Sequence, residues 1–154
     1  GADIINDVSE GEADYTLFRT VAQLNVPYIL MSTKPTLRDM MVSFAQKVQQ
    51  LRDLGVKDII LDPGFGFGKT IEQNFCILSD MEKLRELELP ILVGISRKSM
   101  IFKTLECTPN ESLNGTSVIN TISLMKGASI LRVHDVKEAT EVIKIVNKME
   151  DSCS

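Results

Sequence analysis

The sequence predicts an α/β fold organised around a parallel sheet. Three observations support this prediction: five short apolar runs each end in polar residues, the segments between them have helical periodicity, and the run–helix unit recurs about every thirty residues. Strands that alternate with helices pair in parallel, because parallel neighbours need a crossover of a dozen or more residues. Such folds bind ligands at the carboxyl ends of their strands, so the polar run ends predict an enzyme.

Several predicted elements have a local signal at one end. The strands are expected near residues 3–7, 27–32, 58–62, 90–95 and 129–133, and the helices over about 11–24, 36–54, 71–87, 110–126 and 136–149. Pro27 and Pro90 stand at strand starts, where a missing N–H donor is tolerated. Gly55 and Gly127 follow helices, where a left-handed residue commonly ends the helix. The tail 150–154 is polar and is expected to follow the last helix.

Length and spacing leave two architectures open. The 154 residues have the length of one domain, which we take to span residues 1–154. Five strand–helix units fit a complete open sheet of five strands. They fit equally well the last five units of a (β/α)8 TIM barrel, whose units have the same spacing.

Composition excludes several classes of protein. The net charge is −4 with acids and bases interspersed, which provides neither a basic surface for a nucleic acid nor a cationic amphipathic helix for a membrane. No apolar run reaches the eighteen or so residues of a membrane span. Cys76, Cys107 and Cys153 are far apart, which predicts reduced thiols and a cytoplasmic protein rather than a disulfide framework or a zinc site.

The stretch DPGFGFGKT, residues 62–70, is the first motif with chemical content. Its alternate glycines predict a loop whose backbone a ligand can approach closely, and it departs by one residue from both the P-loop and the Rossmann pattern. Asp62 ends a strand, so its carboxylate can accept hydrogen bonds from the N–C–N edge of a heterocycle. A simple turn before proline is the alternative. Phe65 and Phe67 flank glycines, which fits either packing beneath the loop or contact with a planar ligand.

Two further motifs place cations at strand ends. In SRKSM, the adjacent Arg97 and Lys98 fit either an anionic ligand or two solvated loop charges. In RVHD, Arg132 and His134 share one side of a strand and can cradle a phosphate or pyrophosphate, although a lone histidine is as often structural. Two aspartates are expected to cap turns rather than to take part in chemistry: Asp7 and Asp135.

Four stretches together resemble the dihydropteroate synthase family, the folate-pathway transferases inhibited by sulfonamides. They are GADIINDVS, DPGFGFGKT with Asn74 following, LVGISRKSMI and GASILRVHDV, in the family's order over nearly the whole chain. The resemblance implies that this chain is the fourth to eighth units of a (β/α)8 barrel, a partial barrel of about five strands. It also implies that p-aminobenzoate condenses with 6-hydroxymethyl-7,8-dihydropterin pyrophosphate to give 7,8-dihydropteroate and pyrophosphate.

The resemblance assigns roles to residues at the strand ends. It implies pterin binding by Asn6, Asp62, Met31, Gly94, Lys98 and Arg132. Phe67 and Ser96 match positions that line the p-aminobenzoate site, and Arg132 with His134 matches the pyrophosphate site. The catalytic roles are implied for Lys98, Arg132 and Asp62.

The family's first three units have no counterpart in this sequence, and they carry the asparagine that anchors Mg²⁺, so no metal ligand is expected here. We expect the isolated chain to be inactive or nearly so and poorly stable, associating through exposed edges or as the homodimer that the family implies. Inside the chain, MSTKPT has Ser32 where the family has histidine, which leaves Thr33 and Lys34 without an assigned role. The alternatives are a pterin-binding methyltransferase-type domain and a non-catalytic remnant that binds a pterin or a partner protein.

Overall fold

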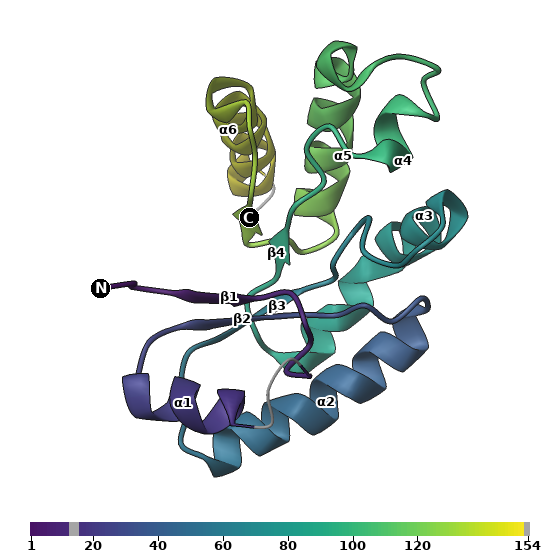
Figure 1. Ribbon diagram of the computed structural model, residues 1–154. Coiled ribbons are helices and arrows are strands. Elements are labelled where there is room, and N and C mark those ends of the chain that lie inside the picture. Colours follow the sequence, from purple (N-terminus) through teal and green to yellow (C-terminus); the bar gives the residue numbers. More distant parts are fainter. Residues whose placement is uncertain (13–15, 153–154) are drawn as a thin grey trace.

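Parallel strands alternate with helices along the whole described chain (Figure 1). The computed structural model describes residues 1–12 and 16–152. The strands are β1 (Ile5–Asp7), β2 (Tyr28–Met31), β3 (Ile59–Asp62), β4 (Leu92–Val93) and β5 (Ile130–Leu131). The α-helices are α1 (Leu17–Leu24), α2 (Leu37–Asp53), α3 (Ile71–Ser79), α4 (Ser99–Phe102), α5 (Leu113–Met125) and α6 (Val136–Ser152). Two 3₁₀ helices are also present, η1 (Met81–Leu87) and η2 (Pro109–Glu111).

The strands form two parallel sheets in the order of the chain. β1, β2 and β3 make a three-stranded sheet, and β4 and β5 make a two-stranded sheet. An isolated pairing of Leu61 with Ile91 joins them, and the Leu61 N–H donates to the Pro90 carbonyl at 2.9 Å. The expected five strands are therefore present in sequence order, but the ladder is interrupted between β3 and β4. A turn follows β4, closed by the Lys98 N–H on the Ile95 carbonyl at 3.0 Å.

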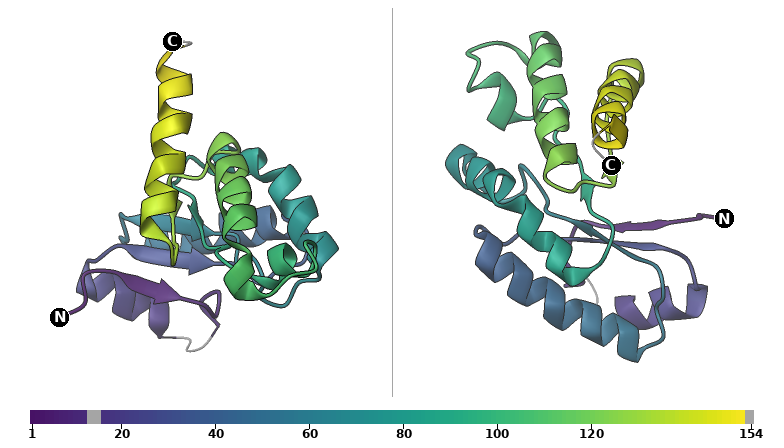
Figure 2. Two further views of the ribbon diagram at one scale, coloured as in Figure 1. Left: turned by 90° about the horizontal axis from the view of Figure 1, so that it is seen from above. Right: turned by 180° about the vertical axis from the view of Figure 1, so that it is seen from behind.

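Helices cover one face of the three-stranded sheet and leave the other face for the site. Tyr28 and Leu30 of β2 are fully buried and belong to the same core as Phe44 of α2. α1 and α2 lie along this face in both Figure 1 and the rear view of Figure 2. Met31 points to the opposite face because strand side chains alternate, and it is in register with Asp62 of β3.

The predicted helix 71–87 is divided at Asp80, which corrects the sequence expectation. α3 ends at Ser79, and Asp80 leaves the helical conformation with φ −109° and ψ 9°. The chain continues as η1, in which Met81 and Leu84 are buried three residues apart. That spacing matches the three residues per turn of a 3₁₀ helix, so apolar periodicity did not distinguish the two helix types.

The predicted helix 110–126 begins later, at Leu113. The residues before it form η2 instead, where the Thr108 N–H and hydroxyl donate to Glu111 Oε2 at 2.9 and 2.7 Å. The four-residue α4 was not predicted from the sequence. Of the predicted helix 11–24, α1 covers the part from Leu17, and residues 13–15 lie outside the described chain.

The C-terminal segment is more helical than expected. The predicted polar tail 150–154 continues α6 as far as Ser152, whose hydroxyl donates to the Lys148 carbonyl at 2.7 Å. Cys76 and Cys107 are free thiols, and Cys153 lies outside the described residues. Searched over residues 1–12 and 16–152, the structure contains no helix that is both long and apolar enough to cross a lipid bilayer.

Candidate active site

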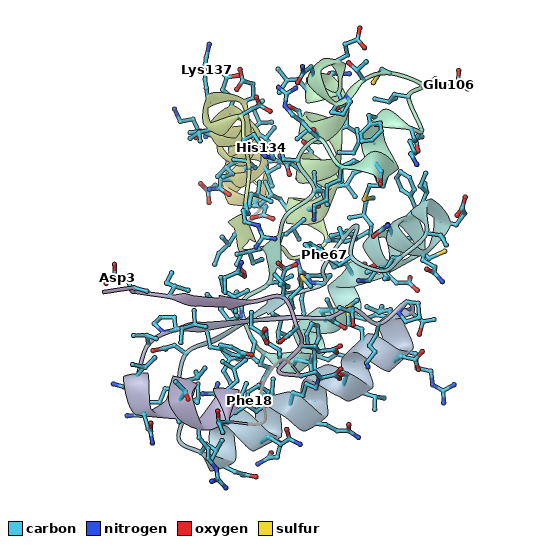
Figure 3. All side chains as sticks on the ribbon, in the orientation of Figure 1. Asp3, Phe18, Phe67, Glu106, His134 and Lys137 are labelled. Atoms are coloured by element: carbon cyan, nitrogen blue, oxygen red, sulfur yellow. The ribbon has the colours of Figure 1, made fainter. Side chains whose placement is uncertain are left out.

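The predicted site residues come from strand ends in both sheets. Asp62 is the last residue of β3, while Ser96 and Lys98 follow β4 and Arg132 and His134 follow β5. In Figure 3, Phe67 lies between the β1–β3 sheet and the half of the molecule that contains α5 and α6, with His134 toward α6. The carboxyl ends of parallel strands thus bring together groups that are up to 70 residues apart in sequence.

An ion pair between Asp62 and Arg132 connects the two sheets. Asp62 is 1% exposed, and its Oδ2 accepts a hydrogen bond from Arg132 Nη2 at 3.1 Å. Its other oxygen, Oδ1, accepts from the Gly64 N–H at 2.8 Å. The guanidinium lies against Gly94, where an added Cβ would come within 2.7 Å of Nη2. Arg132 Nη1 is buried with no acceptor among the described residues, so it retains a donor for a ligand.

Lys98 lies against the glycine-rich loop, with its Cδ 3.2 Å from where a Cβ on Gly66 would stand. Its Nζ donates to the Phe65 carbonyl and lies 4.7 Å from the centroid of the Phe67 ring, a cation–π distance. Burial lowers the pKa of Lys98, and the charge of Arg132 adds to that effect while Asp62 opposes it. Phe67 is partly exposed, so its ring is available to a planar ligand.

Ser96 and His134 complete a small polar cavity. The Ser96 hydroxyl lies 2.9 Å from His134 Nδ1 and accepts from the His134 N–H at 3.3 Å. The cavity has a volume of about 150 Å³ and is lined by Gly94, Ser96, Lys98, Arg132, Val133 and His134. Five of these six residues are predicted site residues, and the cavity therefore gathers two cations and the histidine of the sequence prediction.

The remaining predicted pterin residues lie on the three-stranded sheet. Met31 is fully buried beside Gly64, with its Cγ and Sδ within 3.3 Å of where a Cβ on that glycine would stand. Asn6 is exposed on β1 and is in register with Ile29, two residues before Met31. Measured along the strand direction, Asn6 is therefore two residues, roughly 6–7 Å, away from the position of Asp62.

The two motif aspartates behave differently. Asp7 caps the turn after β1, as expected: it accepts from the Ser9 N–H at 2.8 Å and the Gly11 N–H at 2.6 Å, and also from the Tyr28 hydroxyl at 2.6 Å. Asp135 was expected to cap a turn, but its carboxylate forms a bidentate pair with Arg97 at 2.8 and 2.9 Å.

Arg97 fits neither alternative proposed for the Arg–Lys motif, because its side chain is bound by groups of the protein itself. Besides Asp135, Arg97 donates to the carbonyls of Pro109 and Asn110 at 3.1 and 2.7 Å. The hydrogen bonds from Arg97 also hold the pKa of Asp135 below its ordinary value of 3.8. Arg97 therefore fixes the loop, and Lys98 is the member of the pair that faces the cavity.

Two groups near the site, the half-buried Lys69 and the buried Glu10, were missed from the sequence. Lys69, directly after the glycine-rich loop, donates to three backbone carbonyls. Glu10 is 1% exposed and has a left-handed φ of 59°. It accepts from the hydroxyls of Ser43 at 2.6 Å and Ser32 at 3.1 Å. Ser32 stands where the resemblance implied a histidine. The end of β2 therefore carries a small hydroxyl that is bonded to a buried acid.

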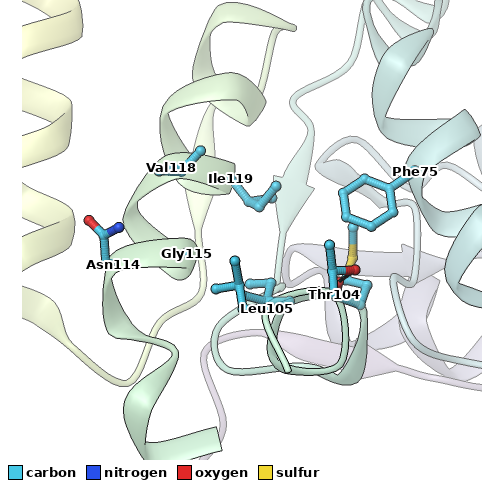
Figure 4. Close-up of a pocket in the computed structure, with 9 residues that line it drawn as sticks. Phe75, Thr104, Leu105, Asn114, Gly115, Val118 and Ile119 are labelled. Carbon is cyan, nitrogen blue, oxygen red and sulfur yellow. Dashed lines mark hydrogen bonds between the residues drawn. The ribbon is translucent and has the colours of Figure 1, made fainter. Parts of the chain in front are cut away.

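A second, apolar groove lies between α3, α4 and α5 (Figure 4). It has a volume of about 210 Å³, and its walls include Phe75, Met100, Leu105, Val118 and Ile119. None of its lining residues is ionisable. It offers no group for acid–base or phosphate chemistry and is separate from the polar cavity.

Metal-binding side chains are not clustered in the described part of the chain. No group of three or more His, Cys, Asp or Glu side chains within residues 1–12 and 16–152 could bind a metal ion.

Similar proteins share this sequence and this arrangement. The family model described as "Pterin binding enzyme" matches residues 1–134. The dihydropteroate synthase of Clostridium beijerinckii is 39% identical, over 96% of this chain and 58% of its own length, and that of Bacillus subtilis is 36% identical, over 97% and 55%. The dihydropteroate synthase of Clostridium difficile, solved in the presence of pteroic acid, superimposes with a TM-score of 0.92 at 30% identity, over 97% of this chain and 60% of that one. This chain therefore spans less than two thirds of these relatives, and it belongs to the family of pterin-binding enzymes.

Proposed function

We propose that this chain supplies the pterin and pyrophosphate part of a dihydropteroate synthase active site. The observation that carries the proposal is the polar cavity, where Lys98, Arg132 and His134 meet beside the buried carboxylate of Asp62. In this proposal the five strand–helix units correspond to the fourth to eighth units of a closed (β/α)8 barrel. The similarity to dihydropteroate synthases over nearly the whole chain supports that assignment.

The reaction proposed joins p-aminobenzoate to 6-hydroxymethyl-7,8-dihydropterin pyrophosphate. The amine nitrogen forms a bond to the methylene carbon, the C–O bond to pyrophosphate breaks with its electron pair, and the amine loses a proton to solvent. Folate biosynthesis is the pathway that consumes the product, 7,8-dihydropteroate. The side chains in the cavity therefore have to hold a heterocycle, stabilise a leaving anion and admit an aromatic amine.

Asp62 suits the first of these tasks. A carboxylate that accepts from two ring or amino N–H groups fixes the orientation of the pterin. It also favours the positive charge that develops on the pterin as pyrophosphate leaves, because charges interact more strongly at a site removed from water. Met31 and Gly94 provide the adjoining wall, and Asn6 lies on the same face of the sheet.

Arg132, His134 and Lys98 suit the second task. Arg132 has a buried Nη1 with no acceptor among the described residues, which an anionic oxygen of pyrophosphate would satisfy. His134 lies on the same rim and is oriented by Ser96 at 2.9 Å. Ser96 and Phe67 border the place left for p-aminobenzoate, with Lys98 between the two substrates.

Four further properties belong to this proposal. Magnesium would be held by residues outside this chain, the whole protein would be a cytoplasmic homodimer, and the isolated chain would turn over little or no substrate. A methyltransferase-type domain is less well supported, because a methyl carrier has no pyrophosphate to occupy the cationic cavity.

Calorimetric titration tests the proposal directly. The protein is titrated with 6-hydroxymethylpterin and, separately, with its pyrophosphate ester. We expect the ester to bind more tightly, Arg132→Met to remove that advantage, and Asp62→Asn to weaken both ligands about tenfold or more. Lys98→Ala is expected to weaken both as well.

Arg38→Met is the matched control, because Arg38 is an exposed arginine on α2. Thermal unfolding of each variant verifies that the fold is retained. Equal affinity of the unmodified protein for the two ligands would contradict a pyrophosphate site, and unaltered binding by Asp62→Asn would contradict a pterin site.

A further inference from the structure

Lys69 uses its whole donor capacity on the protein itself. Its ammonium group donates to the carbonyls of Ser32 at 3.0 Å, Gly64 at 2.9 Å and Phe67 at 3.1 Å. An ammonium group has three donors, so all three are engaged. Lys69 is not among the residues that line the polar cavity, and its role is therefore distinct from that of Lys98.

The three carbonyls belong to two segments that approach each other closely. Ser32 follows β2, whereas Gly64 and Phe67 lie in the glycine-rich loop after β3. At Gly64 the contact leaves no room for a side chain, because an added Cβ would stand 2.2 Å from the Ser32 carbonyl oxygen. Lys69 spans this contact and connects the loop to the end of β2.

The loop has other attachments as well: the Gly64 N–H donates to Asp62 Oδ1 at 2.8 Å, and Lys98 Nζ donates to the Phe65 carbonyl. The Gly66 N–H donates to Asn74 Oδ1 at 2.9 Å, and the Phe67 N–H donates to the Gly64 carbonyl at 3.0 Å. Three glycines with positive φ allow the loop's sharp path but do not hold it, because glycine loses more conformational entropy on ordering than other residues. The Lys69 hydrogen bonds add to these attachments a link between the Phe67 carbonyl and the end of β2.

Charges on neighbouring elements keep the ammonium in place. Asp62 from β3 and Glu10 from the loop after β1 attract Lys69, and Lys98 before α4 repels it. Burial lowers the pKa of Lys69 to about 8, so the group is charged at pH 7 and loses a donor as the pH rises above that value.

We propose that Lys69 is a positioning residue for the p-aminobenzoate subsite: by tying the Phe67 and Gly64 carbonyls to the end of β2, it holds the Phe67 ring under Lys98. This inference rests on the proposed function for the identity of the ligand. It assigns to Lys69 no contact with substrate, so its effect should fall on p-aminobenzoate and spare the pterin.

The test combines amide hydrogen exchange with two titrations of Lys69→Met. Exchange of the amides of residues 64–68 should be about tenfold faster in the variant, with the core helices unaltered. Affinity for 6-hydroxymethylpterin should remain within about twofold, while affinity for p-aminobenzoate, measured on protein saturated with 6-hydroxymethylpterin and pyrophosphate, should fall about tenfold. Lys69→Arg should restore part of both effects, because arginine also donates several hydrogen bonds.

Lys57→Met is the control, because Lys57 is an exposed lysine just before β3. If Lys69→Met does not fold, raising the pH of the unmodified protein from 7 to 9 should accelerate loop exchange beyond the intrinsic effect of pH. Unchanged loop exchange overturns the inference, as does an equal loss of affinity for both ligands. Failure of the unmodified protein to bind either ligand overturns the proposed function and the subsite assignment, and exchange still decides whether Lys69 holds the loop.

Discussion

Replacing Gly64 with alanine measures how tightly the glycine-rich loop is held against β2. Gly64 has φ +65°, a left-handed conformation that costs a residue with a Cβ about 1–2 kcal/mol. The new Cβ would also stand 2.2 Å from the Ser32 carbonyl oxygen, which must move. That oxygen accepts from Lys69 at 3.0 Å, and losing a hydrogen bond to a charged group costs about 1.5–3 kcal/mol. We therefore expect Gly64→Ala to lower the free energy of unfolding by about 3–5 kcal/mol.

Gly68→Ala separates the two contributions. Gly68 has the same φ of +65°, but the nearest atom to an added Cβ is the Thr33 carbonyl oxygen at 3.9 Å, an ordinary contact. Only the conformational cost of about 1–2 kcal/mol should therefore appear. Urea denaturation followed by circular dichroism gives both free energies. An equal decrease in the free energy of unfolding in the two variants would show that the close contact between Gly64 and the end of β2 contributes no extra cost.

Two further predictions concern buried acids. Tyr28→Phe removes the hydroxyl that donates to Asp7 at 2.6 Å, so we expect a loss of about 1–3 kcal/mol in urea denaturation and a higher pKa of Asp7; an unchanged midpoint would contradict this. Burial alone would raise the pKa of Glu10, but the hydrogen bond from Ser43 and nearby lysines outweigh it and hold the pKa below 4.5. Ionised Glu10 therefore stabilises the fold above about pH 4.5, and this contribution is lost as the pH falls through the folded-state pKa. In Ser43→Ala, the melting temperature should therefore fall less steeply as the pH is lowered below about 4.5 than it does in the unmodified protein. The same pH dependence in both proteins would contradict this prediction.

The strands were predicted from the sequence better than the contacts around them were. All five strands lie within the predicted ranges, because buried parallel strands form short apolar runs with polar residues after them. Asp62 and Arg132 were predicted for the same reason: the carboxyl ends of neighbouring parallel strands must meet. The ladder break before β4 was not predicted, because an apolar run does not specify how many of its residues pair with the neighbouring strand.

Lys69, Glu10 and the Arg97–Asp135 pair show why the rest could not be predicted. The acceptors of Lys69 are backbone carbonyls on two segments, and no side-chain pattern encodes their approach. Glu10 accepts hydrogen bonds from one hydroxyl just after β2 and one on α2, which lie 22 and 33 residues away in sequence. The Arg97–Asp135 pair joins residues 38 apart, so the sequence, which left Arg97 either ligand-binding or solvated, did not indicate this contact.

The site lies at the junction between the two sheets, so a bound ligand would connect them. The described strands are joined across this junction by the pairing of Leu61 with Ile91, and the Asp62–Arg132 pair crosses the same boundary. A ligand held by Asp62 on one side and Arg132 on the other acts as a cross-link between two halves of the chain. A ligand at a hundred times its Kd adds about 2.7 kcal/mol to the stability of the folded state. Here that increment should appear first as slower opening of the Leu61–Ile91 pairing between the two sheets. The opening rate of that pairing would therefore report whether the site is filled.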